Sequence, residues 1–162
     1  MRATVTRGLV IGGLFAAACA IAGAQGLLAP NAPRDVPVAA TAASAPELWD
    51  AIAPYVAQAR ASYPQAKGRW LAGLPRGERF FVTVPLTDSA GHCEQVFVAV
   101  HGIADGRIEG RIMTDIALVQ GYRNGQAITV PETALVDWLI SKPDGSEEGN
   151  LVGKYLDAHG GG

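Results

Sequence analysis

The sequence is poor in cysteine: Cys19 and Cys93 are the two it contains. Cys19 lies in an apolar N-terminal stretch that we expect to be removed, which leaves Cys93 alone. A single thiol excludes a disulfide framework within the mature monomer. A lone cysteine on a strand is more often a small buried hydrophobic residue than a nucleophile, so we assign Cys93 to packing.

Basic charge is also scarce. The chain has 13 Lys and Arg residues against 15 Asp and Glu residues. Removal of residues 1–24 takes away Arg2 and Arg7 but no acidic residue, which gives the remaining chain a net charge of −4. This mildly acidic balance suits solubility and offers no basic patch for nucleic acid. We therefore predict no nucleic-acid partner.

Motifs for catalysis and cofactor binding are missing. No serine stands in a G-x-S-x-G motif, and neither a P-loop nor a strand-linked G-x-G-x-x-G occurs. Cys93 and His101 suggest metal ligands, but on one strand they would lie about 26 Å apart. His92 and Glu94 are neighbours on a strand face, and two ligands do not complete a site. The sequence predicts no cofactor and no metal, and leans against an enzyme.

The N-terminus has the three parts of a secretory signal peptide. A short basic region, Met1–Arg7, precedes the apolar stretch Gly8–Ala22, and Ala22-Gly23-Ala24 forms an A-x-A cleavage site. Two alternatives remain open: an uncleaved membrane anchor that extends to Leu28, and a lipoprotein acylated at Cys19. All three place the rest of the chain in the periplasm or on the outer side of the membrane. Membrane contact is then expected through the N-terminal segment alone, if it is retained.

The rest of the chain divides into a linker and one domain. Residues 25–44 are rich in Pro and Ala and show no helical or strand period, which predicts a flexible tether. Residues 45–159 form the domain. A helical stripe starts at Ser44 and Pro46, and Pro54 predicts a kink or break near Ala53. We expect this helix to end at Tyr63, with a second short helix over residues 64–71.

Alternation of apolar residues predicts the sheet. Three successive strands are expected over residues 79–86, 92–101 and 107–113, joined by tight turns, with two more over 126–130 and 135–140. Phe80, Val96 and Val98 fall on the covered face of these strands, and Trp138 anchors the core. The predicted fold is α+β: N-terminal helices packed on a bent antiparallel sheet of about five strands, with a barrel-like sheet as an alternative.

Several pieces of the domain occur together in a known order. They are Phe80–Pro85, Glu94–Val98, Arg107–Ile112, Gly125–Val130, Leu135–Trp138 and Gly149–Tyr155. Over residues from about 59 to 158 the chain resembles the bacterial family called domain of unknown function 2314. Gln95 and Phe97 stand where that family tends to have histidine and tryptophan, so no role of those residues is carried over. The resemblance implies a compact α+β domain and no assigned activity.

Two carboxylates are candidates for function. Glu94 lies on the face that must be covered, so it is solvated at the strand end, or paired with a basic side chain or the Trp138 indole, or functional. Asp137 could cap a turn or act beside Glu94. We predict a non-catalytic exported domain that binds an unknown protein or small ligand in the envelope. The alternatives are an envelope hydrolase with Glu94 and Asp137 as acid–base pair, and a structural or immunity-type protein with an exposed apolar patch.

Overall fold

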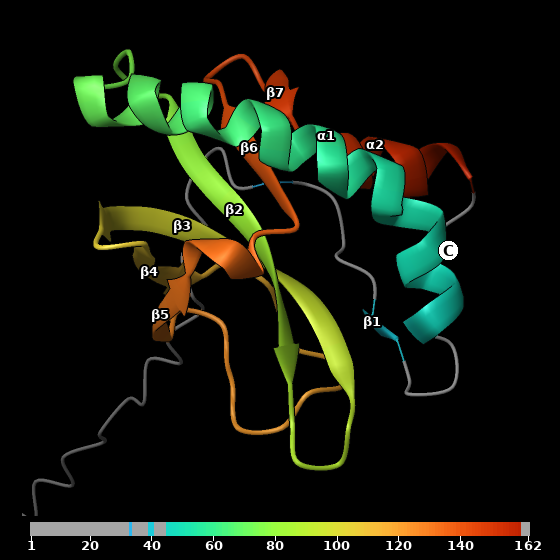
Figure 1. Cartoon of the computed structure of the whole chain (residues 1–162). Helices are drawn as coiled ribbons and strands as arrows, with labels where there is room; N and C mark the ends of the chain where they lie inside the picture. The colour runs from blue at the N-terminus through green and yellow to red at the C-terminus, as the bar shows by residue number, and fades with distance from the viewer. Residues whose placement is uncertain (1–32, 34–38, 41–44, 160–162) are drawn as a thin grey trace, which may run out of the picture.

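The computed structural model describes Pro33, Ala39–Ala40 and residues 45–159. The predicted signal peptide, and the predicted linker apart from Pro33, Ala39 and Ala40, lie outside these residues. The protein is α+β, because the described part forms one antiparallel sheet and two α-helices (Figure 1). Neither of these helices combines the length and the apolar character needed to cross a membrane.

The sheet has more strands than the sequence predicts. Six strands follow the order β5-β4-β3-β2-β6-β7, and β1 pairs with β3 beside this path. Their bounds are β1 Ala39–Ala40, β2 Arg79–Thr87, β3 Cys93–Ala104, β4 Arg107–Ile112, β5 Ala127–Pro131, β6 Asp137–Ser141 and β7 Glu147–Gly149. The expected count of about five was wrong because β1 and β7 are too short to show a period. The path is open between β5 and β7, so the sheet does not close into a barrel.

The three central strands pair as their alternation predicts. In the register of β2 and β3, Val82 lies opposite Val98 and Val84 opposite Val96. On the next strand, Ile112 of β4 lies opposite Val98. These side chains are fully buried on one face, because a strand turns alternate residues to the same side. Phe80, Val96, Val98 and Trp138 all belong to this core cluster.

Helix α1 is longer than the sequence predicts. It runs without interruption over Ala45–Ala72, through both Pro54 and Pro64. The expected end at Tyr63 and the separate second helix were therefore wrong. Both proline rings are exposed, so the backbone bonds they remove are lost on the solvent side, where a helix bends most easily. Figure 1 shows the first turns of α1 at an angle to the rest of the helix.

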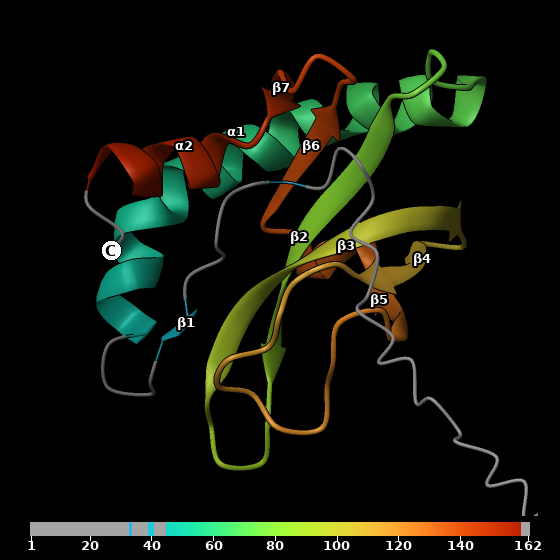
Figure 2. The same cartoon turned by 180° about the vertical axis from the view of Figure 1, so that it is seen from behind.

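Packing against the sheet explains the continuity of α1. Ala59, Tyr63 and Ala66 are buried against the core face, and Trp70, near the end of α1, packs at its border. Figures 1 and 2 show the helix crossing the sheet beside β6 and β2. Burial along this length outweighs the local propensity of Pro64 to end a helix.

The second helix is at the other end of the chain. α2 covers Leu151–Ala158 and follows β7, so the expectation that the helices precede the sheet was wrong for α2. It lies beside the first half of α1 (Figure 2), where Val152 joins Ile52 and Val56 in a small second core. The Tyr55 and Tyr155 rings stack there, with centroids 4.4 Å apart.

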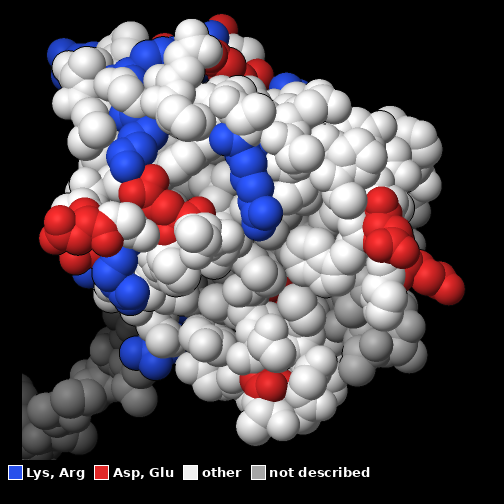
Figure 3. Space-filling view, in the orientation of Figure 1, with Lys and Arg blue, Asp and Glu red and all other residues white. Residues whose placement is uncertain are grey.

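Polar contacts fix α1 to the segment between β5 and β6. This segment contains the 3-10 helix η1, Glu132–Ala134. Lys67 forms an ion pair of 2.8 Å with Glu132, and Arg60 Nε donates to the carbonyl of Leu135 at 2.8 Å. Elsewhere on the face seen in Figure 3, basic and acidic side chains lie interspersed, without a large patch of one sign.

Candidate functional site

Glu94 is buried and holds a loop. Its side chain is 2% exposed, and its carboxylate accepts N–H bonds from Ala117 and Leu118 at 2.9 Å and from Val119 at 3.2 Å. The interpretation of a solvated strand end was therefore wrong, and so was the expected pairing with Lys, Arg or the Trp138 indole. Three backbone donors are enough to satisfy a carboxylate under a covered sheet face.

Asp88 holds the same loop from the β2–β3 turn. Its Oδ2 accepts the N–H of Gln120 at 3.1 Å and lies 2.9 Å from Nδ1 of His92. Its Oδ1 accepts the N–H groups of Ala90 and His92. The His92 ring and the Gln120 amide lower the pKa of Asp88 to about 2. Asp88 and Glu94 together fix the position of the loop 117–120 through hydrogen bonds, so their role here is structural.

Asp137 caps α2 from a neighbouring strand. Its side chain is 1% exposed; Oδ2 accepts the N–H of Val152 at 2.6 Å and Oδ1 accepts that of Trp138 at 2.8 Å. Burial raises its pKa to about 6, although these amides and Lys154 act in the opposite direction. A carboxylate at a helix N-terminus satisfies N–H groups that the helix itself leaves free.

Glu94 and Asp137 do not form an acid–base pair. Glu94 lies opposite Leu86, on the face that α1 covers. Asp137 lies opposite Thr83, and side chains of β2 at positions 83 and 86 point to opposite faces. Since each carboxylate is also bonded to backbone amides, neither is presented to a substrate as the hydrolase alternative requires.

Trp138 has the anchoring position predicted for it. It is 6% exposed, and its indole N–H donates to the Ala59 carbonyl at 3.1 Å and to Ser62 Oγ at 3.0 Å. The ring therefore joins β6 to α1 by packing and by hydrogen bonds.

The other sequence candidates form no assembled centre. Within Pro33, Ala39–Ala40 and residues 45–159, no three His, Cys, Asp or Glu side chains could hold a metal ion together. Cys93 is half-buried and has a free thiol. In the same ranges Leu71 is the exposed large hydrophobic residue, so no extended apolar patch appears there.

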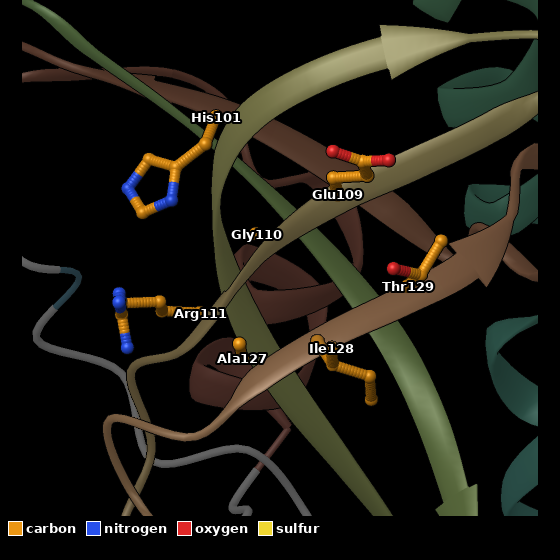
Figure 4. A pocket seen from close by; sticks show the side chains of 7 residues that line it. All are labelled: His101, Glu109, Gly110, Arg111, Ala127, Ile128 and Thr129. Carbon is orange, nitrogen blue, oxygen red and sulfur yellow. The ribbon is translucent and has the colours of Figure 1, made fainter.

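A shallow hollow lies on the opposite face of the sheet from α1. Its volume is about 280 Å³, and it is lined by His101, Glu109, Gly110, Arg111, Ala127, Ile128 and Thr129 (Figure 4). These residues come from β3, β4 and β5, and the lining includes three exposed ionisable side chains. Unlike the buried carboxylates, the ionisable side chains here are exposed to solvent.

A β-bulge in β3 builds the hollow. Val100 pairs with Gly110 but Gly102 pairs with Glu109, so His101 is an extra residue in its strand. Val100 is buried whereas His101 is exposed and turned to the hollow. Bulges re-aim side chains in this way and are common beside binding sites. Sequence analysis missed the site, because alternation predicts a regular strand; the one available signal was Gly102 in an otherwise apolar run.

Comparisons of the chain with protein-family models, with curated proteins and with solved structures find no match.

Proposed function

We propose that this protein is a non-catalytic binding domain of the periplasm or cell envelope, and that the hollow on β3, β4 and β5 is its contact surface. The observation that supports this is that the charged groups differ in burial and in their bonding to the backbone. The buried carboxylates Glu94 and Asp137 are bonded to backbone amides, whereas His101, Glu109 and Arg111 lie exposed around one concavity. Ligand sites are concave and contain a few convergent polar groups.

The export part of the proposal is supported by the N-terminal sequence pattern, a basic start, an apolar stretch and an A-x-A site. A mature net charge of −4 suits a soluble domain that contacts neither nucleic acid nor an anionic surface. Membership of the family of domain of unknown function 2314 stays a prediction and adds no activity.

The test is retention of a ligand or partner from a native envelope extract. The exported protein is immobilised and compared with Arg111→Gln. This substitution removes the positive charge of Arg111 from the hollow, and position 111 is exposed, so strand β4 should be retained. Arg76→Gln is the matched control, since Arg76 is an exposed arginine in the loop that follows α1. We expect mass spectrometry to find species retained by the wild type and by Arg76→Gln but lost from Arg111→Gln.

Two outcomes contradict the proposal. One is an identical set of retained species for all three proteins. The other is turnover on a hydrolase panel that is abolished by Arg111→Gln in a protein whose circular dichroism spectrum is unchanged.

A further inference from the structure

Two residues that line the hollow, Glu109 and Arg111, carry opposite charge. Glu109 and Arg111 are two residues apart on β4, so both point to the same face, with about 6.6 Å of strand between them. Within the described residues no ion pair joins Glu109 to Arg111. Figure 4 shows His101 and Arg111 toward one side of the hollow and Glu109 and Thr129 toward the other.

A hydrogen bond orients Arg111, and a glycine leaves space for Glu109. Arg111 Nη1 donates to the Gly125 carbonyl at 3.0 Å, which orients the guanidinium and leaves its other N–H groups for a ligand. The Glu109 carboxylate lies across β3 at Gly102, where an added β-carbon would be 3.4 Å from Oε2. The absence of a side chain at Gly102 therefore leaves room for the carboxylate.

The size of the hollow limits the ligand. Its volume of about 280 Å³ is just below the range of roughly 300 to 1,000 Å³ typical of small-molecule pockets. Ala127 and Gly110 contribute little bulk to the lining, so a compact ligand can approach the strand backbone. A drug-sized or oligomeric ligand would extend far beyond these walls.

We propose, as a refinement that rests on the proposed function, that the hollow binds a small zwitterion with a carboxylate and an ammonium group one carbon apart, as in a free α-amino acid. The carboxylate accepts N–H bonds from the planar fork of Arg111, beside His101. The ammonium group donates to Glu109 and to the hydroxyl oxygen of Thr129. The site is open to solvent, so the affinity is weak, with a Kd on the order of 1 mM.

The experiment is a titration of the ¹⁵N-labelled mature protein followed by amide chemical shifts. The probe is alanine, with alaninamide and propionate as comparators that lack the carboxylate and the ammonium group respectively. We expect saturable shifts around residues 101, 109–111 and 127–129 with alanine, and binding about tenfold weaker or more with each comparator. Arg111→Gln and Glu109→Gln weaken alanine binding by a similar factor, whereas Arg76→Gln and Glu47→Gln leave it unchanged.

Any of three outcomes overturns the proposal that the hollow binds a zwitterion. They are no saturable shift with alanine at concentrations of about 50 mM, binding of propionate as tight as that of alanine, and alanine binding that Glu109→Gln leaves unchanged. These outcomes are distinguishable from failure of the proposed function. If alanine does not bind but Arg111→Gln still loses species from the envelope extract, the hollow is a contact surface for a different ligand.

Discussion

At the scale of single residues, the burial of Asp137 makes the stability of the protein depend on pH. Its pKa is raised by burial to about 6, above the ordinary value of 3.8. The folded protein therefore keeps a proton that the unfolded chain releases, so the stability from this group is full below pH 3.8 and is lost as the pH rises through 6. We expect the difference in unfolding free energy between wild type and Asp137→Asn to fall by up to about 3 kcal/mol from pH 4 to pH 7. Urea unfolding across this range measures it.

Asp88 provides the control, because its pKa is shifted in the opposite direction. The His92 ring and the Gln120 amide lower it to about 2, so its contribution is present above pH 3.8 and is lost as the pH falls toward 2. Asp88→Asn should alter the pH dependence below 4 and leave the slope between 4 and 7 intact. A difference between wild type and Asp137→Asn that does not vary with pH would contradict the assignment.

Glu94 gives a second prediction at this scale. Glu94→Gln replaces one acceptor oxygen by an NH₂ group that faces the donors of residues 117–119. A buried donor left without a partner costs about 1–3 kcal/mol, which corresponds to a fall in Tm of roughly 4–12 °C for a domain of this size. Differential scanning calorimetry measures the shift. The control is Glu109→Gln on exposed β4, for which the Tm should stay unchanged; equal Tm values for both variants would contradict the role of Glu94.

At the scale of elements, Gly149 sets the path from β7 into α2. Its φ is +81°, and an added β-carbon would lie 2.3 Å from the Trp138 carbonyl oxygen. Gly149→Ala should therefore separate β7 from β6 and loosen α2, with a loss of stability of about 3 kcal/mol or more. Hydrogen exchange should show loss of protection in residues 147–158 before the rest of the sheet.

A Gly121→Ala variant is the control for this experiment, because it distinguishes the cost of backbone strain from that of steric overlap. The φ of Gly121, +87°, is similar, but an added β-carbon would meet no atom within 4 Å. Gly121→Ala should cost about 1 kcal/mol, the price of a left-handed conformation alone. Equal losses for the two variants would mean that the contact with Trp138 does not determine the path of β7.

The elements also show how far the sequence determines the fold. The alternation in residues 79–112 predicted β2, β3 and β4 with their antiparallel order, since one buried face imposes the period. Local signals misjudged α1, because the tendency of Pro64 to end a helix is outweighed by packing against Trp138 of β6, 74 residues further along. The backbone amides that bind Glu94 lie in a loop whose sequence shows no helical or strand period. The bulge at His101 interrupts the alternation of β3. Both depend on contacts between distant segments, which a single sequence does not display.

At the scale of the whole molecule, α1 connects two cores. Its first half packs with α2 around Ile52 and Val56, and its second half covers the sheet around Ala59 and Tyr63. Because one continuous helix belongs to both clusters, neither can lose its packing without exposing part of the other. We expect residues 45–159 to unfold as a single cooperative unit.

Tryptophans report on the two cores separately. Trp49 packs at the α1–α2 core, whereas Trp70 and Trp138 belong to the sheet core. In urea, the fluorescence of a Trp49→Phe variant follows the sheet core, and that of a Trp70→Phe/Trp138→Phe variant follows the α1–α2 core. Their midpoints, each compared with far-UV circular dichroism of the same variant, should coincide within error. An earlier transition for Trp49 alone would show that Pro54 divides α1 into two units, and that α2 and the first turns of α1 can detach while the sheet, with its hollow, stays folded.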